Sequence, residues 1–226
     1  MFLEAAPVMI KRTDPNKNEI FKLEKNLDQI YEFSRELAGY LKTEKITNVV
    51  LLDRKARNMY VGIKEYWKAC FPETPEPNYY FINTKEFQYG NESKIAEEFS
   101  DVYKKLNAAK DQSVLVLDAC IHSGASMFPV KDFLNNNGFI DVRLAAIKTG
   151  DQDPNVLESM DLMVGDNLKN GAARGCTSFG DGTLVERNPG HIYSKPSENE
   201  EDRRKALQSR KEIKAAIAER IAKDNN

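Results

Sequence analysis

The stretch VLVLDACIHSGAS, residues 114–126, decides the expected fold of this chain. Its apolar run ends at Asp118, which is typical of a strand that is buried on both faces of a parallel sheet and ends at a polar tip. A Ser-Gly-x-Ser segment follows and leads into a helix-like run. Gly124 permits a tight turn. A phosphate bound there could accept hydrogen bonds from backbone N–H groups at the helix start and from the hydroxyls of Ser123 and Ser126. The stretch therefore predicts a strand, a phosphate-binding loop and a helix.

Apolar strands and amphipathic helices alternate on both sides of this stretch. Continuous apolar or aromatic runs predict strands at residues 47–53, 78–83, 113–118, 142–148 and 161–165. Helical spacing of apolar residues predicts helices at residues 23–41, 59–70, 95–109 and 125–137. Because such alternation favours right-handed βαβ units, we expect an α/β fold with a Rossmann-type core, a parallel sheet flanked by helices.

The composition argues against several classes of protein. The 33 Lys and Arg residues nearly balance the 35 Asp and Glu residues, so no basic footprint for nucleic acid or membrane surfaces is expected. No run approaches the roughly 18 apolar residues of a membrane span, and the first 20 residues make a poor signal peptide. Three scattered cysteines favour reduced thiols in a cytoplasmic protein.

Residues 114–126 resemble the phosphoribosyl-diphosphate signature of the type I phosphoribosyltransferases. That signature is an apolar strand, two adjacent acids, three variable residues, Thr or Ser, Gly, any residue, and Thr or Ser. Asp118 takes the first acidic position, and Ala119 replaces the second acid. In the family both acids lie against the ribose hydroxyls, so the replacement bears on sugar affinity, metal support and turnover.

The resemblance implies a role for each residue of this loop. Asp118 would bind the ribose hydroxyls and, through water, a Mg²⁺ ion. The 5-phosphate would be bound by Cys120, Ile121, Ser123, Gly124, Ala125 and Ser126. His122 stands where purine-using members often carry an aspartate that exchanges a proton with the purine ring. A histidine suits that role at neutral pH, although His122 could instead supply only its backbone N–H to the phosphate.

Two further segments extend the resemblance, which covers residues 47–166. Arg54, Lys55 and Arg57 follow the strand at 47–53, where the family's pyrophosphate loop lies, and such cations can neutralise a departing diphosphate. A solvated basic turn is the alternative. More loosely, Lys148 and Val164 fall in segments similar to those flanking the base in hypoxanthine-guanine-type members, and the family's flexible loop would fall at residues 84–93.

The pattern changes after residue 150. We expect residues 1–150 to form the α/β phosphoribosyl-binding core with an N-terminal helix. Residues 151–199 are rich in Gly, Asn, Ser and charge over much of their length, and we expect an irregular hood or cap that is mostly loop after residue 166. Residues 200–226 predict a charged C-terminal helix that either packs by one stripe of isoleucines or projects into solvent.

Together these features predict a phosphoribosyltransferase. It would transfer a 5-phosphoribosyl group from phosphoribosyl diphosphate to a nitrogenous base, with a purine slightly favoured, and release diphosphate with the help of Mg²⁺. Asp118 and His122 are the candidate catalytic residues, and a homodimer is a possible assembly. The alternative is a non-catalytic sensor or regulator that binds a nucleotide or phosphoribosyl compound, which Ala119 favours. A third candidate is a hydrolase or phosphotransferase acting on a phosphorylated sugar.

Overall fold

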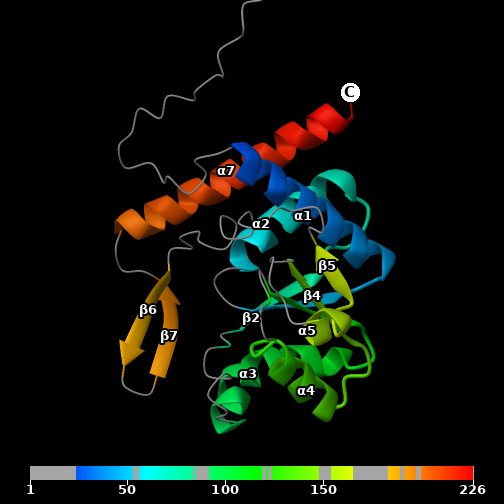
Figure 1. Ribbon diagram of the computed structural model, residues 1–226, viewed down its shortest axis with the longest axis vertical. Helices are drawn as coiled ribbons and strands as arrows, with labels where there is room; N and C mark the ends of the chain where they lie inside the picture. The colour runs from blue at the N-terminus through cyan, green and yellow to red at the C-terminus, as the bar shows by residue number, and fades with distance from the viewer. Residues whose placement is uncertain are drawn as a thin grey trace, which may run out of the picture.

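The computed structural model confirms the expected α/β fold. It describes residues 24–52, 56–82, 84, 92–118, 121, 124–147, 154–164, 183–188, 191–196 and 200–225. A five-stranded sheet has the strand order β2-β1-β3-β4-β5, and every pairing between neighbouring strands is parallel. Helices cover both faces of this sheet, so the core is a three-layer α/β/α arrangement (Figure 1).

The elements follow one another in the alternation that the sequence predicts, with one short helix, α5, that it did not predict. The sheet strands are β1 (Asn48–Leu52), β2 (Asn78–Ile82), β3 (Val114–Asp118), β4 (Val142–Ile147) and β5 (Leu162–Val164). The helices are α1 (Glu24–Thr43), α2 (Ala56–Cys70), α3 (Glu92–Leu106) with a 3₁₀ turn (Asn107–Ala109), α4 (Phe128–Asn136), α5 (Pro154–Glu158) and α7 (Glu200–Asp224). A separate antiparallel hairpin pairs β6 (Thr183–Asn188) with β7 (His191–Pro196).

The central strands are buried on both faces, as their continuous apolar runs predict. Every residue of β1 is buried, and the apolar residues of β3 are fully buried. Successive side chains point to opposite faces of a strand, so Val49 and Leu51 join one hydrophobic cluster while Val50 and Leu52 join the other. These strands therefore form a rigid centre with no solvent-facing side.

The order of the strands determines which helix lies on which face. The chain moves outward from β1 to β2, then crosses back over β1 to β3 and continues in that direction to β4 and β5. Because parallel crossovers are right-handed, this reversal places α2 on one face and α3, α4 and α5 on the other. Helices α1 and α7 complete the layer that α2 begins, and Figure 1 shows these three helices together on one side of the sheet.

Helix α7 packs on the core by one stripe of isoleucines and does not project into solvent, which were the two alternatives that the sequence left open. Ile213 and Ile217 are buried in the same cluster as β1, and α7 contacts both α1 and α2. At its end, the hydroxyl of Tyr31 in α1 donates a hydrogen bond of 2.5 Å to Asp224. The helix also carries an exposed residue, Leu207, which is 56% exposed. The C-terminal helix is thus part of the core layer.

Three boundaries and one segment differ from the predictions. Helix α3 begins at Glu92, three residues before the predicted start, so residues 92 and 93 belong to a helix and not to the predicted flexible loop. Helix α2 begins at Ala56, also three residues before the predicted start, because the buried Ala56 is followed by the polar residues 57 and 58, which hide the apolar period. Helix α4 begins at Phe128 and not at 125, because the carbonyl of Gly124 accepts hydrogen bonds from the N–H groups of residues 127 and 128 and forms a turn first.

The prediction of mostly loop for the segment after residue 166 was wrong for the hairpin β6–β7. Apolar and aromatic residues with strand propensity stand on each side of Pro189 and Gly190, a dipeptide that marks turns. Glycine, asparagine and charged residues dominate the sequence around these two runs, so their strand propensity was not recognised. In the part of the chain that the structure describes, no helix combines the length and apolar character needed to cross a membrane.

Helices α1 and α2 approach closely at Gly62. A Cβ atom added at Gly62 would lie 2.1 Å from Oγ of Ser34, which is buried and donates a hydrogen bond of 2.7 Å to the carbonyl of Ile30. Any side chain here would displace that hydroxyl or separate the helices. Gly39 in α1 differs, because a Cβ atom there would meet nothing within 4 Å.

We expect Gly62→Ala to lower the free energy of unfolding by about 1–3 kcal/mol, the usual cost of overpacking a close contact. Gly39→Ala is the matched control, and we expect it to raise that free energy by about 0.5–1 kcal/mol because alanine favours a helix interior. Urea unfolding followed by circular dichroism measures both values. Equal stability of the Gly62→Ala variant and the wild type would contradict the close packing of α1 on α2.

Candidate functional site

The candidate site lies at the carboxyl ends of β1 and β3. These two strands are paired, with Leu51 of β1 opposite Leu117 of β3, so the chain leaves both strands side by side at one edge of the sheet. The helices that follow them lie on opposite faces of the sheet, the arrangement in which α/β proteins form a ligand-binding crevice. In open parallel sheets, ligands bind beyond the carboxyl ends of the strands at such a reversal of strand order.

The connection after β3 is anchored to the core at two points. Asp118 ends β3, is half-buried and lies opposite Ala146 of β4. The side chain of Ile121 is 2% exposed and belongs to the cluster beneath α3 and α4. The chain thus stays close to the core at Ile121, three residues after the strand tip at Asp118.

A glycine turn joins this connection to α4. Gly124 is buried and has φ +71°, a conformation that other residues rarely adopt. Its carbonyl accepts hydrogen bonds of 2.9 Å from the N–H of Met127 and 3.0 Å from that of Phe128. A Cβ atom at this position would lie only 2.1 Å from the ring of Phe128. The turn therefore requires glycine for both its backbone conformation and its packing.

The start of α4 carries the partial positive charge of a helix N-terminus, but its first backbone donors are largely used. Its N-cap residue, Met127, makes no side-chain hydrogen bond to the helix, the N–H groups of Met127 and Phe128 donate to the carbonyl of Gly124, and Pro129 in the first turn has no N–H. Ala125 is exposed and Ser126 is half-buried within the preceding turn. An anion at this place would therefore depend on the partial charge of the helix terminus and on the preceding turn.

A cation lies on the other side of the crevice, in the first turn of α2. Arg57 is half-buried, and its guanidinium carbon lies 5.1 Å from the ring centroid of Phe81. Phe81 is next to last in β2 and lies opposite Leu51 of β1. Arg57 is therefore near the same edge of the sheet as the glycine turn, above β2 and on the far side of β1 from β3.

The structure brings six of the predicted residues to this edge of the sheet. They are Arg57, Asp118, Ile121, Gly124, Ala125 and Ser126. Val164 ends β5 two strands away from β3, and its side chain is fully buried in the core. The remaining predicted residues lie outside the described part of the chain, namely Arg54, Lys55, Ala119, Cys120, His122, Ser123 and Lys148, as do residues 85–91 of the predicted flexible loop.

Sequence reasoning missed two aromatic residues that shape the site. Phe128 covers Gly124, and Phe81 lies against the guanidinium group of Arg57. A partial signal exists for Phe128, because it stands four residues after the glycine and so lies over the turn. Phe81 stands 24 positions from Arg57 in the sequence, and only the pairing of β1 with β2 brings the two together.

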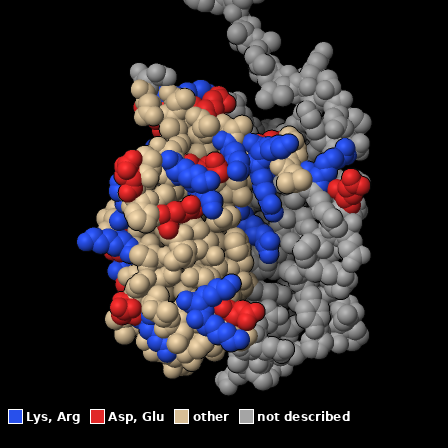
Figure 2. Space-filling view, turned by 180° about the vertical axis from the view of Figure 1, so that it is seen from behind, with Lys and Arg blue, Asp and Glu red and all other residues tan. Residues whose placement is uncertain are grey.

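The surface charge is mixed. Figure 2 shows Lys and Arg side chains interspersed with Asp and Glu side chains over the described part of that face. Several of them form ion pairs, such as Lys214 with Glu65 at 2.9 Å and Lys64 with Glu76 at 3.4 Å. Attraction of an anionic ligand would therefore depend on the local groups of the crevice and not on a broad positive surface.

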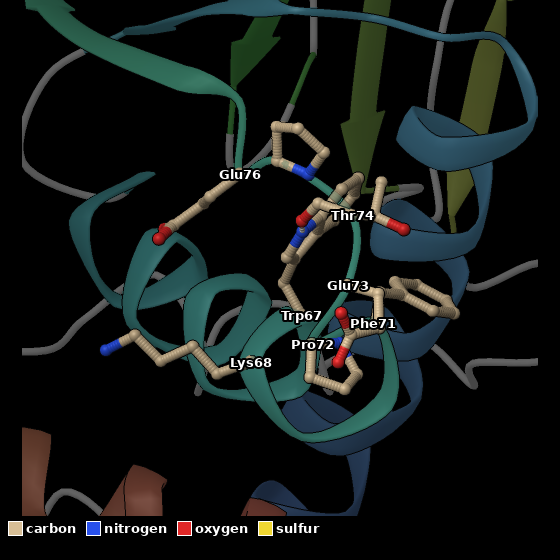
Figure 3. A pocket seen from close by; sticks show the side chains of 8 residues that line it. Trp67, Lys68, Phe71, Pro72, Glu73, Thr74 and Glu76 are labelled. Atoms are coloured by element: carbon tan, nitrogen blue, oxygen red, sulfur yellow. Dashed lines mark hydrogen bonds between the residues drawn. The ribbon is translucent and has the colours of Figure 1, made fainter.

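A hollow of about 520 Å³ lies elsewhere, between the end of α2 and the start of β2. It is lined by Trp67, Lys68, Phe71, Pro72, Glu73, Thr74, Pro75 and Glu76. Figure 3 shows Lys68 and Glu76 extending to one side of Trp67, with Phe71 and Thr74 on the other. Trp67 donates a hydrogen bond of 3.0 Å from Nε1 to the carbonyl of Thr74. This hollow is at the amino end of β2, the opposite edge of the sheet from the crevice.

Comparison with protein-family models found no match, and comparison with curated protein sequences found no significant similarity.

We expect Gly124→Ala to weaken the binding of inorganic phosphate about ten-fold, because the left-handed conformation costs a non-glycine residue roughly 1–2 kcal/mol and the Phe128 ring must also move. Gly138→Ala is the matched control. Gly138 also has a positive φ, +87°, but lies after α4, at the other end of that helix from Gly124, and an added Cβ would lie 3.9 Å from the nearest atoms, in the side chain of Lys110. Calorimetric titration with phosphate measures the difference, and equal affinities in the two variants would contradict phosphate binding at the glycine turn.

Proposed function

We propose that this chain is a cytoplasmic phosphoribosyltransferase that transfers a 5-phosphoribosyl group from phosphoribosyl diphosphate to a nitrogenous base. The observation that carries the proposal is the position of the Ser-Gly-x-Ser turn. It follows β3 where strand order reverses, beside the connection after β1 that holds the basic segment. Two anion-binding features that the sequence predicts separately thus share one edge of the sheet.

The spacing of these features supports an elongated ligand with two anionic ends. The glycine turn follows β3, whereas Arg57 lies above β2, and β1 stands between these strands. Neighbouring strands are roughly 4.8 Å apart, so the two features are separated by about 10 Å. A ribose that carries a phosphate at one end and a diphosphate at the other fits this separation better than a ligand with a single phosphate group.

Asp118 lies at the tip of β3, on the same side of β1 as the glycine turn, and would bind the sugar. A carboxylate repels phosphate but accepts hydrogen bonds from hydroxyl groups. The ribose hydroxyls are therefore the natural partners of Asp118. In the proposed complex the ribose would lie beside the tip of β3, with the 5-phosphate toward α4 and the diphosphate toward α2.

Transfer would exchange one bond at carbon 1 of the ribose for another. The bond to the diphosphate oxygen breaks, and that oxygen keeps the electron pair. A ring nitrogen of the base attacks carbon 1 from the opposite face through an oxocarbenium-like state and then loses its proton. Arg57, with Arg54 and Lys55, would neutralise the charge that develops on the diphosphate. His122 is the proposed acceptor of the proton from the base.

A Mg²⁺ ion fits this arrangement. Magnesium is usually held by one or two carboxylates together with substrate phosphates and water, and Asp118 is a carboxylate at the strand tip. Asp118 would hold the ion through a water molecule. When bound, the ion would neutralise part of the negative charge of the diphosphate. The acid missing at Ala119 leaves the substrate to provide more of the coordinating oxygens.

The second candidate function is a sensor that binds phosphoribosyl diphosphate or a nucleotide without turnover. The replacement of the second acid by Ala119 favours it. Such a protein would keep the phosphate turn and the cationic side of the crevice, because both serve binding. It would lack only the groups that act during transfer.

Magnesium-dependent release of diphosphate tests the proposal. We expect release to require phosphoribosyl diphosphate together with one base from a panel of purines and pyrimidines, and to fall when Gly124→Ala weakens binding of the 5-phosphate. The Gly138→Ala variant serves as the control with unchanged release. Tight calorimetric binding of phosphoribosyl diphosphate without turnover on any base would reject catalysis and support the sensor.

Restoring the second acid is a separate test of the site. We expect Ala119→Asp to raise turnover about ten-fold, because a charge-assisted hydrogen bond to a ribose hydroxyl contributes roughly 1.5–3 kcal/mol. Ala119→Asn is the matched control, since it adds a similar volume without the charge and should give little of this gain. Steady-state release of diphosphate measures both. Equal turnover of the Asp and Asn variants would show that the site does not use a second carboxylate.

A further inference from the structure

The cationic side of the crevice rests on aromatic side chains from α2 and β2. The guanidinium carbon of Arg57 lies 5.1 Å from the ring centroid of Phe81. Phe81 meets the ring of Tyr60 edge to face, at 5.3 Å and 88°, and Tyr60 meets Tyr79 at 4.9 Å and 68°. We call the three rings of Phe81, Tyr60 and Tyr79 the aromatic shelf.

The spacing of these residues in the two elements forms the shelf. Arg57 and Tyr60 are three positions apart on α2 and therefore share one face of the helix, whereas Tyr79 and Phe81 are two positions apart on β2 and point to the same face of the sheet. Both of these residues of β2 pack against the cluster beneath α2. The contact between Arg57 and Phe81 is therefore part of how α2 packs on the edge strand.

The far end of the shelf is held by polar contacts. Lys64 donates a hydrogen bond of 3.1 Å from Nζ to the hydroxyl of Tyr60, and its Nζ lies 3.4 Å from a carboxylate oxygen of Glu76. These contacts fix the ring of Tyr60, against which Phe81 stands. Burial around the shelf raises the pKa of Tyr79, so its hydroxyl stays neutral. The rings consequently offer Arg57 a fixed surface.

We propose that Phe81 is a positioning residue that holds the guanidinium group of Arg57 toward the diphosphate end of the ligand. The proposal rests on the proposed function and assigns to Phe81 the selection of diphosphate over single phosphate at this end of the crevice. A guanidinium group that lies over a ring is held by the ring face, and its planar fork of N–H donors lies at its edges. That fork can bind two oxygens of a diphosphate at once, which a freely rotating arginine does less well.

The ring of Phe81 acts by reducing the freedom of Arg57. An unrestrained arginine loses much of its rotamer entropy when it binds an anion, whereas a guanidinium group already stacked on a ring loses less. Phe81 therefore affects affinity for the diphosphate end without touching it. The phosphate turn at Gly124 lies on the other side of β1 and should not depend on Phe81.

Calorimetric titration with inorganic pyrophosphate and, separately, inorganic phosphate tests this role. We expect Phe81→Leu to weaken pyrophosphate binding about three- to ten-fold, the range that cation–π contacts support, with phosphate binding unchanged. Phe81→Tyr keeps the ring and should restore wild-type affinity. In the double variant with Arg57→Gln, Phe81→Leu should cause no further loss, because the two residues act as a pair.

Tyr80→Leu is the matched control. It removes an aromatic ring from the same strand, but Tyr80 packs against the opposite cluster, beneath α3 and α4. We expect its affinity for pyrophosphate to equal that of the wild type. Thermal unfolding of each variant verifies that the comparison is between folded proteins, and Phe81→Tyr provides the comparison if Phe81→Leu loses stability.

The outcomes separate this proposal from the proposed function. The positioning role is overturned if the Phe81→Leu variant binds pyrophosphate as tightly as the wild type does. It is also overturned if Phe81→Leu lowers the affinity for pyrophosphate by the same factor in the Arg57→Gln variant as in the wild type. Release of diphosphate by the wild type would still support the transferase in that case. If the wild type does not bind pyrophosphate and releases no diphosphate, both proposals are overturned together.

Discussion

The right-handedness of parallel crossovers, acting on one reversal of strand order at β1, is the constraint on which the rest of this structure depends. The chain moves from β1 to β2 in one direction and then returns across β1 to build β3, β4 and β5. Each crossover must keep its hand, so α2 lies on one face and α3 to α5 on the other. The same reversal sends the helices after β1 and β3 to opposite faces, and in open parallel sheets ligands bind beyond the strand ends at such a point.

That reversal also leaves one face of the sheet short of cover. Three crossover helices lie on one face, but α2 alone lies on the other, above β1 and β2. The apolar side chains of β3 and β4 on this face, such as Leu117 and Ile147, would otherwise meet water. Helix α1 and helix α7 supply the missing layer, from opposite ends of the described chain, and Ile213 and Ile217 of α7 are buried there. The C-terminal helix therefore contributes to the platform on which the crevice stands.

The sequence predicted the elements better than their arrangement, for physical reasons. The strands β1 and β3 are recognisable because burial on both faces demands continuous apolar residues. The start of α4 was misplaced because a turn made by the carbonyl of Gly124 looks like helix in a pattern of side chains. The hairpin β6–β7 was missed because its short apolar runs stand among many turn-forming residues.

The candidate site shows the same division. The glycine turn is local, so the position of Gly124 in the sequence was enough to predict a tight turn there. The contact of Arg57 with Phe81 is not local, because it depends on the pairing of β2 with β1 and on the side of the sheet that α2 covers. Strand order cannot be read from periodicity, so residues that meet only across strands stay invisible in a single sequence.

The replacement of the second acid at Ala119 has two opposing effects on such a crevice. In the proposed transferase, a carboxylate there would accept a hydrogen bond from the ribose, and its absence would weaken binding of the sugar. The same carboxylate would repel the phosphate and diphosphate groups nearby, and its loss makes the crevice less negative. A site with Asp118 alone therefore gives up affinity for the neutral part of the ligand and opposes the charged parts less. Binding then depends more on the two anionic ends, which are the parts that the glycine turn and the shelf-supported Arg57 would contact.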